Sequence, residues 1–400
     1  MVTSIPETIS QATCRTPLGI NAKLSAIQSP GGSQPIQGPE RARLHRLERF
    51  AIQREAKSLL GWKRLNECMV APILSTVNVM LSTEHQAAHY KGLATCGSVW
   101  VCSVCAAKVS ERRRAELNRA ISAWRDQEGG SVLLLTLTFP HKANDPLKPM
   151  LEAFQNARQK LRADRAYKAF LQRLGVEGTI ASLEVTHGEN GWHPHVHILL
   201  FSDWSEDERA IALSENPELL EEYKSCVYRA WKRVCERAGL PTPSEAHGVD
   251  IRDGSYAADY AAKWGMASEL TKAHLKRGRK GSRTPWDLLR SSLYEDDDQA
   301  GELFKDYAYA FRGRKQLHWS KGLRDKLGLG QELTDEEVSE QTLEPSTLLA
   351  QLSRDEWRLV VRYRFQEALL TIAETEGLIG IQRFLEYLKT LGSLPRAATT

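Results

Sequence analysis

The chain has 400 residues with 42% hydrophobic content, which suits two or three globular domains. The sequence has no apolar run of about 18 residues and no secretory signal at its start, so we expect a cytoplasmic protein without membrane contact. The net charge of +4 is uneven, because residues 331–400 hold 12 acidic and 7 basic side chains. The remainder therefore carries +9, which suggests a basic body that meets an anionic partner.

The N-terminal third is expected to hold a small DNA-binding module. Residues 1–38 are rich in Ser, Pro, Gln and Gly and are expected to be disordered. Residues 39–60 alternate arginine with leucine and phenylalanine and predict a helix. We assign residues 39–125 to a helical, zinc-binding module that contacts DNA.

A cysteine cluster in this module indicates a structural zinc ion. Cys96, Cys102 and Cys105 are spaced as x5 and x2, and the CxxC pair is a typical zinc knuckle. Free thiols or a redox pair are the weaker alternatives in a reducing compartment. The candidates for the fourth ligand are His89, which we favour, His85 and Cys68.

Two basic runs are candidates for contacts with DNA phosphates. Arg112, Arg113 and Arg114 open the helix that follows the cysteines. The second run contains Lys276, Arg277, Arg279 and Lys280. Runs of this kind are also common as solvated surface, so charge alone does not decide their role.

The middle of the chain predicts an α+β fold, an antiparallel sheet covered by helices, over residues 126–325. Strands are expected at 131–139, 179–187, 193–201 and 247–253, and helices at 147–173, 206–238 and 256–264. Asn190-Gly191 predicts a two-residue type I′ hairpin turn between the second and third strands. An acidic linker is expected over 326–345, followed by a helical C-terminal segment over 346–400.

Three alternating histidines indicate a metal site on the third of these strands. His193, His195 and His197 project to one face because side chains alternate along a strand. With Asn190-Gly191 as the turn, Glu184 lies opposite His197 on that face. Two imidazoles and a carboxylate suit a catalytic Mn²⁺ or Mg²⁺ ion. We assign His195, His197 and Glu184 as ligands, with His193 as a further candidate; three satisfied histidines without metal are the alternative.

Two tyrosines follow on the predicted helix at 256–264. Tyr256 and Tyr260 are four residues apart, and Lys263 follows on the same helical face. A tyrosine hydroxyl beside a metal-bound phosphate can attack phosphorus, and a lysine can stabilise the developing charge. Such tyrosines are more often packing residues, but a metal site earlier in the chain favours catalysis.

Together these motifs resemble the HUH endonuclease superfamily, and more narrowly plasmid rolling-circle replication proteins. The resemblance covers about residues 90–325 and rests on SVLLLTLTF, HPHVH and YAADYAAK in that order. GLATCGSVWVCSVCAAK, EVTHGENGWHPHVHILL and FRGRKQLHWSKGL are similar to the Gram-negative plasmid branch. It implies that His195 and His197 bind metal and that Tyr260 is the nucleophile. Tyr256 stands where some relatives have a glutamate, which favours the two-tyrosine type.

The resemblance implies a bacterial plasmid initiator that nicks a single-stranded segment of the double-strand origin, leaving a 5′-phosphotyrosine and a free 3′-hydroxyl. The sequence contains no G-x-x-x-x-G-K-[ST] motif, so we expect a host helicase and the host replication machinery as partners. A two-tyrosine transposase is an alternative on the same fold. A zinc-containing DNA-binding regulator without catalysis is the alternative from another class.

Overall fold

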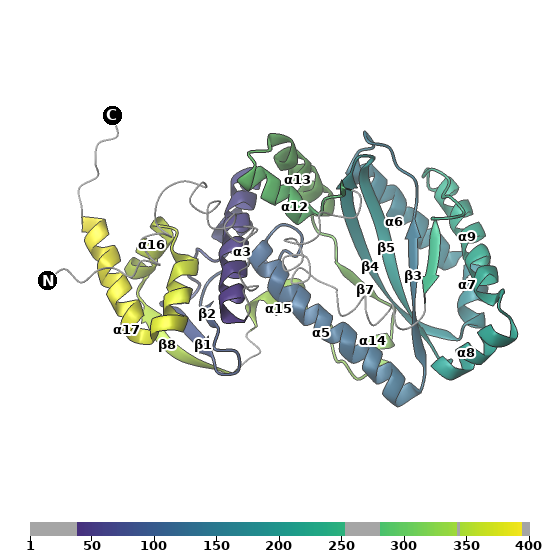
Figure 1. The fold of residues 1–400 in the computed structure, drawn as a ribbon, viewed down its shortest axis with the longest axis horizontal. Helices are drawn as coiled ribbons and strands as arrows, with labels where there is room; N and C mark the ends of the chain where they lie inside the picture. Colours follow the sequence, from purple (N-terminus) through teal and green to yellow (C-terminus); the bar gives the residue numbers. More distant parts are fainter. Residues whose placement is uncertain (1–37, 253–280, 342–344, 394–400) are drawn as a thin grey trace, which may run out of the picture.

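The computed structural model describes residues 38–252, 281–341 and 345–393 as an elongated molecule with a sheet in each half (Figure 1). One sheet has five strands and the other has three. Two long helices, α3 (Pro39–Leu60) and α5 (Ser103–Glu128), lie between the halves (Figure 1). The predicted α+β architecture with antiparallel strands is confirmed.

The larger sheet runs in the order β6-β3-β5-β4-β7, and every pairing in it is antiparallel. Its strands are β3 (Ser131–Thr138), β4 (Val176–Gly188), β5 (Gly191–Ser202), β6 (Val249–Arg252) and β7 (Leu317–Trp319). The long β4–β5 hairpin forms the middle of the sheet. Its tip extends beyond the end of β3, which stops at Thr138 opposite His195.

Helices cover both faces of this sheet, because its strands carry apolar side chains on both faces. Leu135 and Val196 face one layer, and Leu134 and Phe201 face α5 on the other side. The first layer contains α6 (Leu147–Ala163), α7 (Arg165–Arg173), α9 (Leu219–Arg237), α12 (Pro285–Tyr294) and α13 (Asp298–Phe311). The short helices are α4 (Lys63–Glu67), α8 (Glu206–Glu215), α14 (Leu323–Lys326) and α15 (Asp335–Glu340).

The smaller sheet differs from the expectation of a purely helical C-terminal segment. β8 (Ser346–Leu352) pairs antiparallel with β1 (Val77–Ser82), which also pairs with β2 (Ala88–Lys91). α16 (Arg354–Arg362) and α17 (Gln366–Ser393) then pack on this sheet around a core of their own. The C-terminal segment therefore completes a body begun near residue 77. The acidic stretch before it also contains α15, which packs against α5.

Buried ion pairs fasten α17 to α3. Arg46 donates through Nη1 to Glu374 at 2.5 Å, and Arg43 donates to the same carboxylate at 3.0 Å. Arg54 pairs with Glu367 at 3.0 Å. Burial raises the pKa of Glu374, but the hydrogen bonds and charge of Arg46 outweigh it and hold that pKa below its ordinary value.

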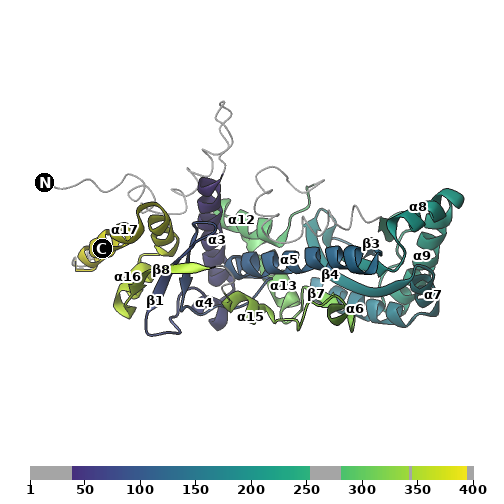
Figure 2. The ribbon, with the colours of Figure 1, turned by 90° about the horizontal axis from the view of Figure 1, so that it is seen from below.

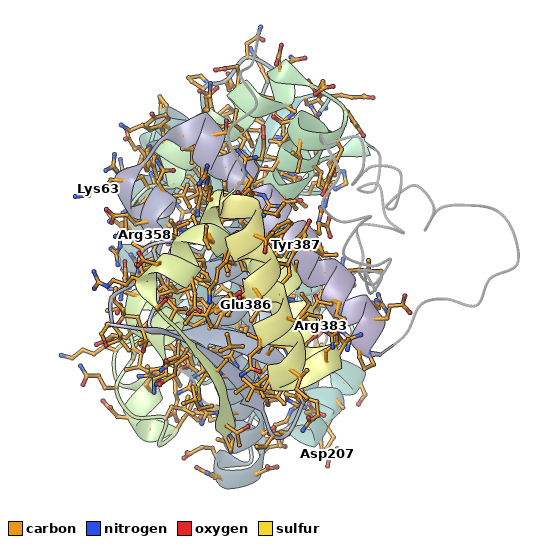
Figure 3. The ribbon with its side chains drawn as sticks, turned by 90° about the vertical axis from the view of Figure 1, so that its left-hand side faces the viewer. Lys63, Asp207, Arg358, Arg383, Glu386 and Tyr387 are labelled. Carbon is orange, nitrogen blue, oxygen red and sulfur yellow. The ribbon has the colours of Figure 1, made fainter. Side chains whose placement is uncertain are left out.

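Glu374→Gln is expected to lower the free energy of unfolding by roughly 3 kcal/mol at pH 7, because it strips buried arginines of their counter-charge. The folded pKa of Glu374 is lowered, so its contribution is present above the ordinary carboxyl pKa and disappears as the pH falls through the lowered value. Urea unfolding at pH 7 and at acidic pH measures both effects. Glu386→Gln, on the exposed side of α17 (Figure 3), is the control; equal losses in both variants would contradict the argument.

No helix in residues 38–252, 281–341 or 345–393 is both long and apolar enough to cross a membrane.

Candidate functional site

The β4–β5 hairpin carries the predicted metal ligands, in a register two residues from the expected one. Gly188 pairs with Gly191, so Glu189 and Asn190 form the turn. Glu184 therefore lies opposite His195, whereas the sequence had placed it opposite His197. A shift of two residues preserves the face of every side chain, so the three residues still meet.

The turn explains the difference in register. The type I′ turn expected at Asn190-Gly191 needs positive φ at both residues, but only Gly191 has it, with φ of 81°. A Cβ atom on Gly191 would lie 2.7 Å from the carbonyl oxygen of Ala143. His141 also holds the turn, through a 2.7 Å contact between its Nδ1 and the carbonyl of Asn190. Glycine is therefore needed here for a close tertiary approach as well as for the turn.

Glu184, His195 and His197 converge on one point. Glu184 Oε2 lies 3.4 Å from Nε2 of His195 and 3.8 Å from Nε2 of His197. One ligand atom from each of the three lies within 4.8 Å of the other two. Two nitrogens and one oxygen at this spacing fit a divalent ion that keeps open positions for substrate or water.

Two threonines of β3 orient the histidines, a role that the sequence analysis missed. Thr136 Oγ1 lies 2.9 Å from Nδ1 of His197. With Thr136 accepting from the Nδ1 proton, Nε2 keeps its lone pair for a metal ion. Thr138 Oγ1 lies 2.8 Å from Nε2 of His193. The available signal was the alternation of Thr136 and Thr138 in an otherwise apolar strand.

His193 lies beside His195, with ring centroids 5.3 Å apart, but its nitrogens do not join the converging group. It stacks on His141 with ring centroids 5.1 Å apart. The three rings also differ electrostatically. Burial, with the nearby His195 and His141, lowers the pKa of His193 to about 4. Burial likewise lowers the pKa of His197 more than Glu184 raises it. For His195, burial opposes a charged ring, but the hydrogen bond and charge of Glu184 raise its pKa.

The cysteine cluster contains four thiols, and Cys68 is the fourth. Cys68, Cys96, Cys102 and Cys105 are all buried and close together. The Sγ of Cys68 lies 3.8 Å from that of Cys102 and 3.5 Å from that of Cys105, and Cys96 and Cys105 are 3.7 Å apart. Zinc–sulfur bonds of about 2.3 Å in a tetrahedron place the sulfurs about 3.8 Å apart. The cluster therefore fits one zinc ion.

The sequence favoured His89 as the fourth ligand, but the structure places Cys68 beside the other three cysteines. His89 lies on β2 and is not in the cluster. Cys68 follows α4, and that helix carries its thiol to the start of α5, where Cys102 is the N-cap. The side-chain amide of Gln53 donates to Cys102 at 3.1 Å and to Cys68 at 3.4 Å. The thiols influence one another: burial raises the pKa of Cys102, but hydrogen bonds from its neighbours outweigh it and lower that pKa, and the hydrogen bond to Cys102 raises the pKa of Cys96 and of Cys105.

Arg112, Arg113 and Arg114 lie well inside α5, which begins at Ser103, and each pairs with an acidic side chain. Arg113 is buried and binds Glu116 and Asp335, each at 3.0 Å, which ties α15 to α5. Arg112 pairs with Glu116 at 3.4 Å, and Arg114 pairs with Glu111. Their contact with DNA phosphates stays a prediction, and carboxylates one turn away and on α15 pair with these arginines in the structure.

The tyrosine helix and the second basic run lie outside the described residues. These are Tyr256, Tyr260, Lys263, Lys276, Arg277, Arg279 and Lys280. β6 ends at Arg252, directly before this segment, and lies beside β3. Within β6, Asp250 is the Cα partner of Thr136. Asp250 therefore lies in the same row of the sheet as Thr136 and His197, two residues before the end of β6.

A sequence profile of the replication protein family matches residues 91–369, more than half of the chain. The chain belongs to that replication protein family. "Protein rep" of Streptomyces lividans is 30% identical over 295 residues, covering 60% of this chain and 64% of that protein. A "Neomycin resistance protein" of Streptomyces cyanogenus is 33% identical over 144 residues, covering 30% of this chain and 33% of that protein.

These matches cover less than two thirds of the length of either relative. No solved structure matches the chain. The stretch that the family profile matches in this replication protein contains the β4–β5 hairpin and the residues from 256 to 263, together with Cys96, Cys102 and Cys105. Cys68 lies before it.

Proposed function

We propose that this replication protein initiates rolling-circle replication of a plasmid by nicking one strand of the origin. The observation that carries the proposal is the meeting of Glu184, His195 and His197 at one point on the sheet of a replication protein. Binding to DNA alone does not require such a ligand group. A metal ion held by these residues would offset the negative charge on a phosphodiester while it is cut.

The three side chains would hold Mg²⁺ or Mn²⁺ near the middle of β5. A divalent ion there supplies positive charge beside the scissile phosphate. The chain's own contribution is orientation. Thr136 fixes the ring of His197, and Glu184 Oε2 lies beside Nε2 of both histidines as the third ligand atom. Residues of β3, β4 and β5 thus pre-arrange the ligand atoms on a rigid sheet, which lowers the cost of binding substrate.

In this proposal, Tyr260 is the nucleophile. Its hydroxyl oxygen forms a bond to phosphorus while the bond between phosphorus and the 3′ oxygen breaks, and the phenol proton leaves as the 3′ oxygen gains one. The products are a 5′-phosphotyrosine and a free 3′-hydroxyl that primes synthesis. Tyr256 would make the second cut, and Lys263 would stabilise charge on the phosphate. Lys276, Arg277, Arg279 and Lys280 would contact the DNA backbone.

The proposed partners follow from this reaction. The substrate is origin DNA that is single-stranded at the nick, and a host helicase and replication machinery extend the 3′ end. The four-cysteine cluster, with zinc, would shape the body that positions this DNA. The HUH fold and the two-tyrosine branch are part of the proposal.

Cleavage of labelled single-stranded oligonucleotides, tiled across the plasmid origin and incubated with Mn²⁺ or Mg²⁺, tests the proposal on a denaturing gel. A metal-dependent covalent adduct is expected in the intact chain and in Tyr256→Phe, and none in Tyr260→Phe. A transposase would instead form its adduct on the ends of a mobile element. Origin binding without any adduct would overturn the nickase and favour the DNA-binding regulator.

A further inference from the structure

A groove of about 810 Å³ lies next to the cysteine cluster, outside the proposed nicking site. Its walls come from α4, the loop between Cys96 and Val101, the end of α13 and residues 332–336. Gly97 has φ of 65° and approaches Glu336 so closely that a Cβ would lie 2.8 Å from its Cα. The cysteine cluster thus holds one wall of the groove in place.

The groove carries excess positive charge. Six basic and three acidic side chains line it, and each acid already has a basic partner in the lining. Asp335 pairs with Arg113 at 3.0 Å, Glu336 with Arg64 at 3.2 Å and Glu332 with Lys315 at 3.6 Å. The basic side chains left over are Arg312, Arg314 and Lys63, of which Lys63 is 3.9 Å from the exposed Glu67 outside the lining. Neither Arg312 nor Arg314 has an acidic partner within ion-pair distance among the described residues.

Aromatic rings accompany these charges. The guanidinium of Arg312 lies over the ring of Trp62, 5.1 Å from its centroid. Tyr309 lies next to the lining, packs edge-on against Trp62 at 5.6 Å and is 55% exposed. Aromatic rings beside cations bind single strands, because unpaired bases stack while phosphates meet the charges. Paired bases in a duplex do not offer their faces in this way.

The lining of the groove includes a residue of β7, an edge strand of the sheet that carries the metal ligands. This residue, Leu317, pairs with Ser182, which pairs in turn with His197. Residues directly opposite one another share a face, so Leu317 and His197 lie on the same side of the sheet. With neighbouring strands about 4.8 Å apart, β7 lies roughly 10 Å from β5. A strand of DNA leaving the metal site can therefore reach the groove within a few nucleotides.

We propose that this groove binds the single-stranded DNA that flanks the nick. The proposal rests on the proposed function for its substrate, but the groove is distinct from the proposed nicking site. Lys63 marks its outer edge and is 89% exposed. Figure 3 shows Lys63 on the same side of the molecule as Arg358 of α16, whereas Arg383 of α17 lies toward the other side. In Figure 2, α4, α15 and α16 lie along one edge of the molecule.

Fluorescence anisotropy of a labelled oligo-dT with the full chain tests this groove without any cleavage step. Lys63→Ala/Arg312→Ala is expected to weaken single-strand binding about tenfold and to reduce the slope of log affinity against log salt by roughly 1.4, the loss of two phosphate contacts. Arg383→Ala/Lys168→Ala removes the same charges from exposed positions outside the groove and is expected to bind as the unmodified chain does. The affinity of Lys63→Ala/Arg312→Ala for a duplex of equal length is expected to equal that of the unmodified chain.

Two results would overturn the groove as a single-strand site. One is unchanged oligo-dT affinity in Lys63→Ala/Arg312→Ala; the other is an equal loss for the duplex. Photocrosslinking of bromodeoxyuridine DNA to the unmodified chain gives an independent readout, with adducts expected at peptides containing Trp62 or Tyr309, and crosslinks confined to other peptides would contradict it. If the groove variant loses affinity but no nicking is found, the groove stands and the proposed function fails.

Discussion

Cys68→Ser is expected to lower bound zinc from about one ion per chain to a small fraction of that, because it leaves only three thiolates. The cluster joins α4, the loop before α5 and the N-cap of α5, so its loss should loosen all three. We expect the unfolding midpoint to fall by roughly 10 °C, which corresponds to about 3–5 kcal/mol in a body of this size. Zinc analysis by mass spectrometry and thermal unfolding measure the two effects.

Two matched variants make this result specific to the cluster. His89→Gln alters the residue that the sequence favoured as fourth ligand and should keep its zinc, because His89 lies outside the cluster. Cys235→Ser alters a buried thiol of α9 and should also keep it. Full zinc content in Cys68→Ser would exclude the four-cysteine site, and loss of zinc in His89→Gln would restore the histidine as a ligand.

Glu184→Gln is expected to reduce metal-dependent cleavage of the origin oligonucleotide at least a hundredfold. The substitution keeps the size of the side chain but removes the charged oxygen shared by His195 and His197. Thr136→Val, which removes only the partner of His197 Nδ1, should reduce cleavage less, by about 10- to 100-fold. Cleavage rates over a titration of Mn²⁺ measure both, with the loss expected in metal affinity as well as in rate.

His193→Gln is the matched control within the same strand. Its ring stacks on His141 and faces Thr138, so cleavage should fall much less than in His197→Gln. A loss in His193→Gln equal to that in His197→Gln would show that the ligand set is wider than the three converging residues. Unchanged cleavage in Glu184→Gln would contradict the metal site altogether.

Alternation along strands was enough to predict the shared face of Glu184, His195 and His197, because a period of two is local. The register was not predictable, since it depends on positive φ at one residue and on Gly191 meeting Ala143. Cys68 was missed as the preferred ligand for a similar reason. Nothing in its sequence spacing shows that the chain returns it to Cys102. Likewise, the ion pairs that occupy Arg113 reach α15, some 220 residues away.

β8 is a whole element that could not be predicted from local sequence. STLLAQL is rich in leucine and reads as part of a helical segment, yet it forms a strand because β1 offers it an edge. The segment is a strand only because a partner distant in sequence pairs with it, and local propensity does not predict that pairing. The antiparallel α+β class of the sheet around the histidines could be predicted, because most of its strands have a strong residue pattern within their own sequence.

The pairing of β8 with β1 also sets an order of events during synthesis. A ribosome makes Val77–Ser82 early and Ser346–Leu352 only after every strand of the larger sheet. Until then β1 has one open edge, and the apolar residues that later meet α16 and α17 are uncovered. An unpaired edge beside exposed apolar surface invites aggregation and proteolysis. A chain whose translation stops before residue 346 would thus be open to degradation. The part of the body that β1 begins becomes stable only after the C-terminal segment has been made.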